Sequence, residues 1–357
     1  MGSRSVRVRE GSQSQVRIPV FAQLHEHARC RYGIDPRRYF RNATVLVRAQ
    51  SECIRSYGMD EFMVLYDVYN IEAEALGQPL VFPQSGTPQL AGSRLLAPGT
   101  NIQDLRLNMS SAGWAGAVRF VSGVNRLVRR ETGTAPPLFF TAPFSLAVQL
   151  KGYTAFVTEL KRDSGLARHL LEVITGQVLV PWIRCLHDGC PDSPMAMGAD
   201  AWGSLPNADL ETWDRFIIPI YRYLKEILAD EIPVGFVGYW GESLTSNPCG
   251  FINRKIEVAG PSFGGSVVAM DPDVERLGPI FFAHAARKLG RPLILGVDAA
   301  LLRNGTPPDI ARRVENYVES AKKEQVPVSI LLADVSGDTP PENVLAAIGA
   351  AYCFTGS

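Results

Sequence analysis

Short apolar runs alternate along the chain with stretches whose apolar residues recur at helical spacing. The runs have the length of buried strands and lie at 17–24, 61–66, 137–141, 195–199, 234–239, 266–270, 292–297 and 328–332. Helical spacing between them is clearest at 36–57, 110–130 and 308–323. Eight buried strands alternating with helices are typical of a parallel barrel. The pattern therefore predicts an α/β fold, a (β/α)8 TIM barrel with an N-terminal extension.

Two stretches depart from this pattern. Residues 1–15 carry three arginines without an apolar run, which predicts a flexible N-terminal lead-in rather than a signal peptide. Residues 78–100 are rich in Gly, Pro, Ser and Gln, which indicates a hairpin or arm laid over one end of the barrel. We expect residues 16–357 to form a single barrel domain, because barrels of this length are commonly single.

Composition narrows the class of partner. The 36 basic and 36 acidic residues balance, and nucleic-acid binding needs a basic surface, so we expect none. No apolar segment approaches the roughly 20 residues that span a bilayer, so we expect no membrane association. The six cysteines form no CxxC pair, which is typical of reduced thiols in a cytoplasmic enzyme. The oligomeric state stays open, with a homodimer as one option.

Acidic residues follow six of the eight predicted strands. They are Asp67, Asp200, Glu242, Asp271, Asp298 and Asp334. Parallel barrels place their chemistry at the carboxyl ends of the strands. Each acidic residue alone could instead cap the next helix. As a set they mark one mouth of the barrel, where some should face the substrate.

Two carboxylates and an imidazole suggest a metal site near the fifth predicted strand. Glu242 follows that strand directly, Glu257 comes later, and His284 lies in an apolar run. Such side chains could hold a divalent ion with one position open, and Cys249 between the glutamates is a further candidate ligand. The alternatives are a helix cap for Glu242, a solvated ion pair for Glu257 and a core position for His284.

Several segments resemble the uroporphyrinogen decarboxylase superfamily. In order along the chain they are 57–60 (YGMD), 67–77 (DVYNIEAEALG), 141–147 (TAPFSLA), 296–298 (GVD), 301–307 (LLRNGTP) and 338–344 (DTPPENV). The resemblance covers nearly the whole chain from about Ile18 and implies a (β/α)8 barrel. The superfamily holds porphyrinogen decarboxylases and methyltransferases that work with corrinoid proteins.

Two branches of the superfamily match less well. The decarboxylases bind their polycarboxylate substrate through arginines after the first strand, whereas 21–27 here contains none before Arg29. The thiol-methylating members bind zinc through a His-x-Cys pair after the fifth strand and a cysteine after the eighth. Here residues 238–240 are Gly-Tyr-Trp at the place of the His-x-Cys pair, and Ala333 stands where the cysteine after the eighth strand would be. Porphyrinogen decarboxylation is therefore only a distant alternative.

The chain is most similar to the methyltransferase component of corrinoid-dependent O-demethylases. Their zinc ligands are Asp or Glu, a Glu after fourteen residues and a His after twenty more. Glu242 and Glu257, with fourteen residues between them, match the first spacing, whereas twenty-six residues separate Glu257 from His284. The resemblance implies that these three hold Zn²⁺, which takes up charge on an ether oxygen. The methyl group would pass to the cobalt of a corrinoid (cobalamin) on a partner protein, with Glu242 and Asp67 as catalytic residues.

We expect the substrate to be a small methylated molecule at the barrel mouth. The predicted substrate-binding residues are His25, His27, Tyr66, Tyr69, Asp200, Tyr239, Trp240 and Asp298. Aromatic walls suit a methoxylated ring of the phenyl methyl ether type, but they could equally hold a quaternary ammonium. A corrinoid-dependent transferase for a methylated amine and a non-catalytic ligand-binding barrel therefore remain as alternatives.

Overall fold

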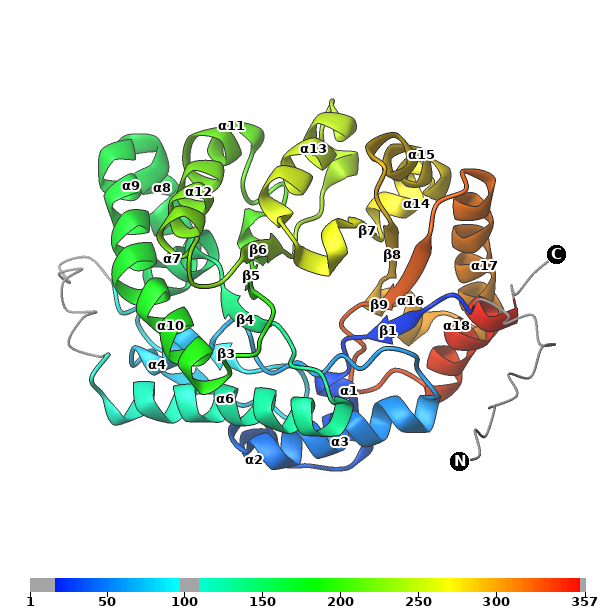
Figure 1. Cartoon of the computed structure of the whole chain (residues 1–357), viewed down its shortest axis with the longest axis horizontal. Coiled ribbons are helices and arrows are strands. Elements are labelled where there is room, and N and C mark those ends of the chain that lie inside the picture. Colours follow the sequence, from blue (N-terminus) through cyan, green and yellow to red (C-terminus); the bar gives the residue numbers. More distant parts are fainter. Residues whose placement is uncertain (1–16, 97–108, 354–357) are drawn as a thin grey trace, which may run out of the picture.

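The computed structural model of the chain describes residues 17–96 and 109–353. Its main strands form two parallel sheets, drawn on opposite sides of a common interior (Figure 1). One sheet has the order β1 (Val20–Ala22), β9 (Val328–Leu332), β8 (Leu293–Val297) and β7 (Val267–Met270). The other has the order β4 (Leu138–Thr141), β5 (Ala196–Ala199) and β6 (Val234–Val237). Pairing of sequential strands in parallel register, with helices outside, makes the fold a TIM barrel, as the sequence predicted.

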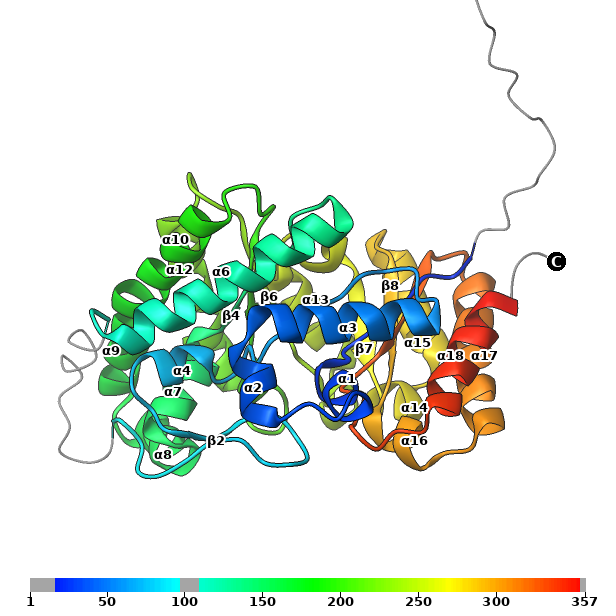
Figure 2. The ribbon, with the colours of Figure 1, turned by 90° about the horizontal axis from the view of Figure 1, so that it is seen from below.

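Helices cover the outside of the strands (Figures 1 and 2). In chain order the α-helices are α1 (His25–Arg31), α2 (Pro36–Arg41), α3 (Ala43–Tyr57), α4 (Ile71–Ala75), α6 (Ala112–Thr132), α7 (Pro143–Lys151), α8 (Tyr153–Arg162), α9 (Ser164–Val173), α10 (Val180–Gly189), α11 (Leu210–Thr212), α12 (Ile218–Ile227), α13 (Pro248–Ala259), α14 (Asp273–Leu277), α15 (Pro279–Leu289), α16 (Ala299–Asn304), α17 (Pro307–Lys323) and α18 (Pro341–Cys353). Shorter π- and 3₁₀-helical turns are η1 (Ile174–Leu179), η2 (Ala201–Gly203), η3 (Trp213–Ile217), η4 (Glu242–Leu244) and η5 (Ser262–Gly265). Among the described helices, none is long and apolar enough to cross a bilayer.

Polar caps explain where several helices begin. The stretch predicted as one helix at 36–57 is two, because the Asn42 side chain accepts a hydrogen bond from the Val45 N–H and so starts α3. Asp35 caps α2 ahead of Pro36, a residue favoured in the first turn of a helix. Figure 2 shows α3 and α6 packed side by side over one end of the barrel wall.

The second predicted strand is not a paired strand in the structure. Segment 61–66 has no regular secondary structure, and the Gln50 side chain of α3 hydrogen-bonds to both backbone polar groups of Leu65. Leu65 N–H donates to Gln50 Oε1 at 2.9 Å, and Gln50 Nε2 donates to the Leu65 carbonyl at 2.6 Å. A buried amide side chain therefore satisfies the backbone there in place of a neighbouring strand. Apolar periodicity cannot distinguish these two arrangements.

Two other features shape the barrel interior. β2 (Leu80–Val81) and β3 (Gln89–Leu90) pair antiparallel, so the described part of the predicted arm is a hairpin. Among the described strands, β6 and β7 do not pair with each other, although they follow one another along the barrel. Helix α13 lies between β6 and β7 in the chain and packs against β6 and against η5, the turn that precedes β7. The predicted lead-in and residues 97–100 lie outside the described residues.

Candidate functional site

A cavity of about 520 Å³ lies inside the barrel, lined at one end by residues that follow the strands. This volume is in the range of small-molecule sites. Most of the wall is apolar and includes Leu65, Phe139, Phe236, Ile252, Phe263 and Leu331. Its polar side chains include Gln23, His25, Asp67, Asn70, Lys255 and Asp334. Among the lining residues that the structure describes there is no arginine.

Asp67 is a buried carboxyl group of this wall. It is 6% exposed, and Asn70 Nδ2 donates to its two oxygens at 2.9 and 3.0 Å. Burial outweighs these hydrogen bonds and raises the pKa of Asp67 to about 7. The carboxyl group is therefore substantially protonated near neutral pH. It can hydrogen-bond to a substrate either as a donor or as an acceptor.

The loop that carries Asp67 is fixed by a buried contact that sequence reasoning missed. Glu72 of α4 accepts hydrogen bonds from the N–H of Thr141 at 3.0 Å and from its hydroxyl at 2.6 Å. The same hydroxyl lies 2.6 Å from the Val68 carbonyl. Burial raises the pKa of Glu72 to about 7. The position of Glu72 within an apolar helix was the available signal, since buried glutamates need such partners.

His25 and Asp334 line the cavity just beyond the ends of β1 and β9. His25 begins α1, and its buried Nδ1 has no hydrogen-bond partner among the described residues. Burial lowers the pKa of His25, with a nearby Asp334 carboxylate opposing the shift. Asp334 has a φ of 42°, a left-handed conformation that aspartate adopts more readily than most residues other than glycine, and its N–H donates to Gln23 Oε1 at 2.9 Å. A ligand in the cavity could therefore supply the partner that His25 lacks.

Four predicted aromatic residues also line the cavity, namely Tyr66, Tyr69, Tyr239 and Trp240. The hydroxyl of Tyr66 donates to the Phe139 carbonyl, and that of Tyr239 donates to the Tyr221 hydroxyl at 2.7 Å. Both polar ends are thus satisfied within the protein. These rings offer the cavity their apolar surfaces, as suits a ring-shaped substrate.

Three predicted substrate-binding residues lie outside the cavity lining. His27 Nδ1 is 3.0 Å from the Ser336 carbonyl and its Nε2 is 2.8 Å from the Tyr57 hydroxyl, so it supports the wall from behind. Asp298 caps α16 by accepting from the Leu301 N–H at 2.7 Å. Asp200 is buried and accepts hydrogen bonds from the hydroxyls of Ser145 and Tyr221. Each of the three side chains therefore has hydrogen-bond partners within the protein.

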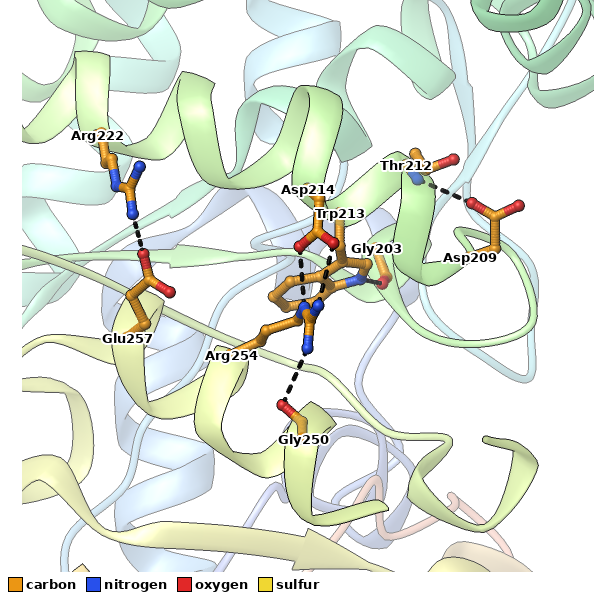
Figure 3. A network of polar contacts seen from close by, with 9 residues as sticks. All are labelled: Gly203, Asp209, Thr212, Trp213, Asp214, Arg222, Gly250, Arg254 and Glu257. Carbon is orange, nitrogen blue, oxygen red and sulfur yellow. Dashed lines mark hydrogen bonds and ion pairs between the residues drawn. The ribbon is translucent and has the colours of Figure 1, made fainter. Parts of the chain in front are cut away.

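The structure does not bring the three predicted zinc ligands together. Glu242 is fully buried, whereas the side chain of Glu257 is 43% exposed and pairs with Arg222 of α12 (Figure 3). The side chain of His284, on α15, is 59% exposed, with Nδ1 3.5 Å from Glu324 Oε2. Within the described residues, no three His, Cys, Asp or Glu side chains are grouped as a metal site would need. The residues present do not fit the predicted zinc site, and the candidate ligand Cys249 is exposed.

Helix geometry explains why the spacing misled. Successive helical residues are about 100° apart, so Glu257 and Lys255 project from nearly opposite sides of α13. Lys255 faces inward, where Nζ donates to Glu242 Oε1 and, at 2.8 Å, to the Val268 carbonyl of β7. Burial raises the pKa of Glu242, and the Lys255 ammonium opposes that shift. The partner of Glu242 is therefore Lys255, which lies two positions before Glu257 in the chain.

Comparison with known proteins establishes the family. The family model described as uroporphyrinogen decarboxylase (URO-D) matches residues 3–353. The chain therefore belongs to the uroporphyrinogen decarboxylase family, and the resemblance seen in the ordered segments is confirmed.

One solved structure similar to this chain is a methyltransferase from Methanosarcina mazei, with a TM-score of 0.71 and 15% sequence identity. The similarity covers 96% of this chain and 95% of that one, and at this identity it shows the fold. The comparison with curated proteins gives no match.

Proposed function

We propose that the protein is a methyltransferase that takes a methyl group from a small methoxylated ring and passes it to the cobalt of a corrinoid on a partner protein. The observation that carries this proposal is the cavity itself. It is small, mainly apolar and free of arginine among its described lining residues, and it presents a carboxyl group, Asp67, whose pKa is raised to about 7. These properties suit a ring with an ether oxygen.

The same cavity argues against porphyrinogen decarboxylation. A porphyrinogen with eight carboxylates needs several cationic partners, of which arginine is the most effective. Lys255 is the only Lys or Arg among the described lining residues, and it is already paired with Glu242. Binding such a substrate would leave most of its charges buried without partners, which is costly.

Asp67 supplies the chemistry that the proposed reaction requires. The methyl–oxygen bond breaks, its electron pair stays on the oxygen, and the methyl group bonds to cobalt through two electrons of the reduced metal. An aryl alkoxide is a poor leaving group, so we assign Asp67 to donate its proton to that oxygen. Asn70, bonded to both oxygens of the carboxyl group, orients it. The carboxylate then regains a proton from solvent.

The raised pKa of Asp67 suits an ether as the donor, because an ether oxygen takes up a proton when its methyl group leaves, whereas the amine released from a quaternary ammonium needs none. A quaternary ammonium remains the alternative donor, because the aromatic walls and the lining carboxyl groups of Glu26 and Asp334 would attract it. The corrinoid must come from a partner, because a cavity of about 520 Å³ holds a small substrate and a corrinoid is far larger.

A donor screen tests this proposal. Purified protein is mixed with cob(I)alamin and, separately, with methoxybenzenes, tetramethylammonium and uroporphyrinogen. The expected result is methylcobalamin formation, followed by absorbance, with the methoxybenzenes alone. Methylation by tetramethylammonium would move the assignment to an amine donor. Release of CO₂ from uroporphyrinogen, without methylation by any donor, would contradict the proposal.

A further inference from the structure

Lys255 is a buried cation in the cavity wall with unused hydrogen-bonding capacity. Its residue is 9% exposed, and it lines the cavity between Ile252 and Ile256 of α13. A lysine ammonium has three N–H donors. Two are used, by Glu242 Oε1 and by the Val268 carbonyl. The third has no partner among the described residues.

The barrel's irregularity explains why a lysine is placed there. Because β6 and β7 do not pair, the Val268 carbonyl of β7 lacks a strand partner on that side. Lys255 Nζ reaches this carbonyl at 2.8 Å and so satisfies a backbone group that would otherwise be buried alone. This contact and the pair with Glu242 hold the ammonium at the wall. The site is therefore pre-organised before any ligand enters.

Glu242 is the carboxylate that pairs with Lys255. It is fully buried, and while one oxygen accepts from Lys255, its Oε2 has no hydrogen-bond partner among the described residues. The nearby Asp273 is occupied by the N–H groups of Gly241 and Ser243, at 2.6 and 2.9 Å. An anion in the cavity would therefore share the ammonium with Glu242, through the N–H that Glu242 and Val268 leave free. The apolar surroundings strengthen such a contact.

We propose that Lys255 is a substrate-binding residue whose free N–H holds one anionic oxygen, a carboxylate or a phenolate, of a small aromatic ligand. That this ligand is the methyl donor rests on the proposed function. A single cation fits a ligand with a single negative charge, because the other lining residues with charged side chains, Glu26, Asp67 and Asp334, are acidic. Lys255 thus sets specificity for a monoanionic ring and fixes its orientation relative to Asp67.

Calorimetric titration tests the proposal without requiring any methyl transfer. The probes are benzoate and its uncharged analogue benzamide, with 4-nitrophenolate and nitrobenzene as a second pair that separates carboxylate from phenolate. We expect the protein to bind at least one anion more tightly than its neutral analogue. Hydrogen bonds to charged groups account for about a tenfold preference or more.

The variants isolate the lysine. Removing Lys255 alone leaves Glu242 buried and unpaired, so the informative comparison is Glu242→Gln against the double variant Glu242→Gln/Lys255→Met. We expect Glu242→Gln to bind the anion at least as tightly as the natural protein, because it removes the competing carboxylate. The double variant should lose the anion preference, while its affinity for the neutral analogue stays within about twofold.

Lys225→Met is the matched control. Lys225 of α12 is half-buried and donates to the Val258 carbonyl of α13 at 2.9 Å, but it is not among the cavity-lining residues. Its replacement should leave the anion preference unchanged. The proposal would be overturned if the double variant kept that preference, or if it lost anion and neutral analogue equally. An anion preference that depends on Lys255 in a protein without methyl transfer would refute the proposed function and leave this inference intact.

Discussion

Replacing Asp67 by asparagine should lower the rate of methyl transfer and, as the pH rises, raise the free energy of unfolding relative to the natural protein. Burial raises the pKa of this carboxyl group from 3.8 to about 7. Between these values the folded protein holds a proton that the unfolded chain has released. The folded state binds more protons, so the free energy of unfolding falls as the pH rises through this window. The proton bound to Asp67 therefore makes its full contribution to the stability of the folded state below about pH 4, and this contribution is lost above about pH 7.

The size of this effect follows from the two pKa values. The difference between 3.8 and about 7 corresponds to a penalty of about 4 kcal/mol once the group is ionised in both states. Roughly 2.5 kcal/mol of this penalty appears between about pH 5 and pH 8. An asparagine side chain cannot ionise, so Asp67→Asn should remove this share. Asp200, whose pKa is also raised, remains in both proteins and cancels from the comparison, and Glu72 changes little because Asp67 is a minor influence on its raised pKa.

Urea unfolding at about pH 5 and pH 8 measures the difference directly. The stability of Asp67→Asn relative to the natural protein should rise by roughly 2.5 kcal/mol between the two conditions. Methyl transfer should fall by about 10²- to 10⁴-fold, as expected for loss of a general acid. In the natural protein kcat/KM should decline above about pH 7 as Asp67 loses its proton. A stability difference that does not vary with pH, or full activity in the variant, would refute the reasoning.

Three further predictions concern the surroundings of the site. Glu257→Ala and His284→Ala should each change the free energy of unfolding by less than about 1 kcal/mol, because both side chains are exposed. Neither variant should alter methyl transfer, and loss of transfer in either would restore the zinc hypothesis. Glu242→Ala should cost about 3–5 kcal/mol in urea unfolding by leaving Lys255 buried and unpaired, and adding Lys255→Met should recover part of that loss; purely additive losses would contradict the pairing. Gln50→Ala should cost about 1–3 kcal/mol and speed amide hydrogen exchange in segment 62–66, whereas unchanged exchange would show that the amide does not hold it.

The barrel was predictable because its strands are read from apolar runs alone. Seven of the eight predicted runs overlap strands of the structure, and their order along the chain fixes the parallel topology. Segment 61–66 has the same composition but pairs with Gln50 instead of a strand. A side chain distant in sequence decided that outcome, and periodicity carries no information about it. The break in helix 36–57 was signalled by Asn42, a favourable cap.

The site was only partly predictable, since spacing does not specify direction. Tyr239 and Asp334, which follow β6 and β9, line the cavity at the carboxyl ends of the strands, whereas Asp200 and Asp298 also follow strands but do not line it. Glu257 matched a ligand spacing but projects outward from α13. Lys255 sits among the buried Phe251, Ile252 and Val258, and a charge on such an apolar face was the signal for an internal partner.

The most direct test of the account is a single-turnover reaction with a methoxybenzoate that carries a deuterated methyl group. The protein is mixed with this donor and cob(I)alamin, and the corrinoid is analysed by mass spectrometry. The account predicts cobalamin bearing the deuterated methyl group, together with the corresponding hydroxybenzoate, and almost none with Asp67→Asn. Unlabelled corrinoid with intact donor, under conditions where calorimetry shows the donor bound, would contradict the assignment of a methyltransferase.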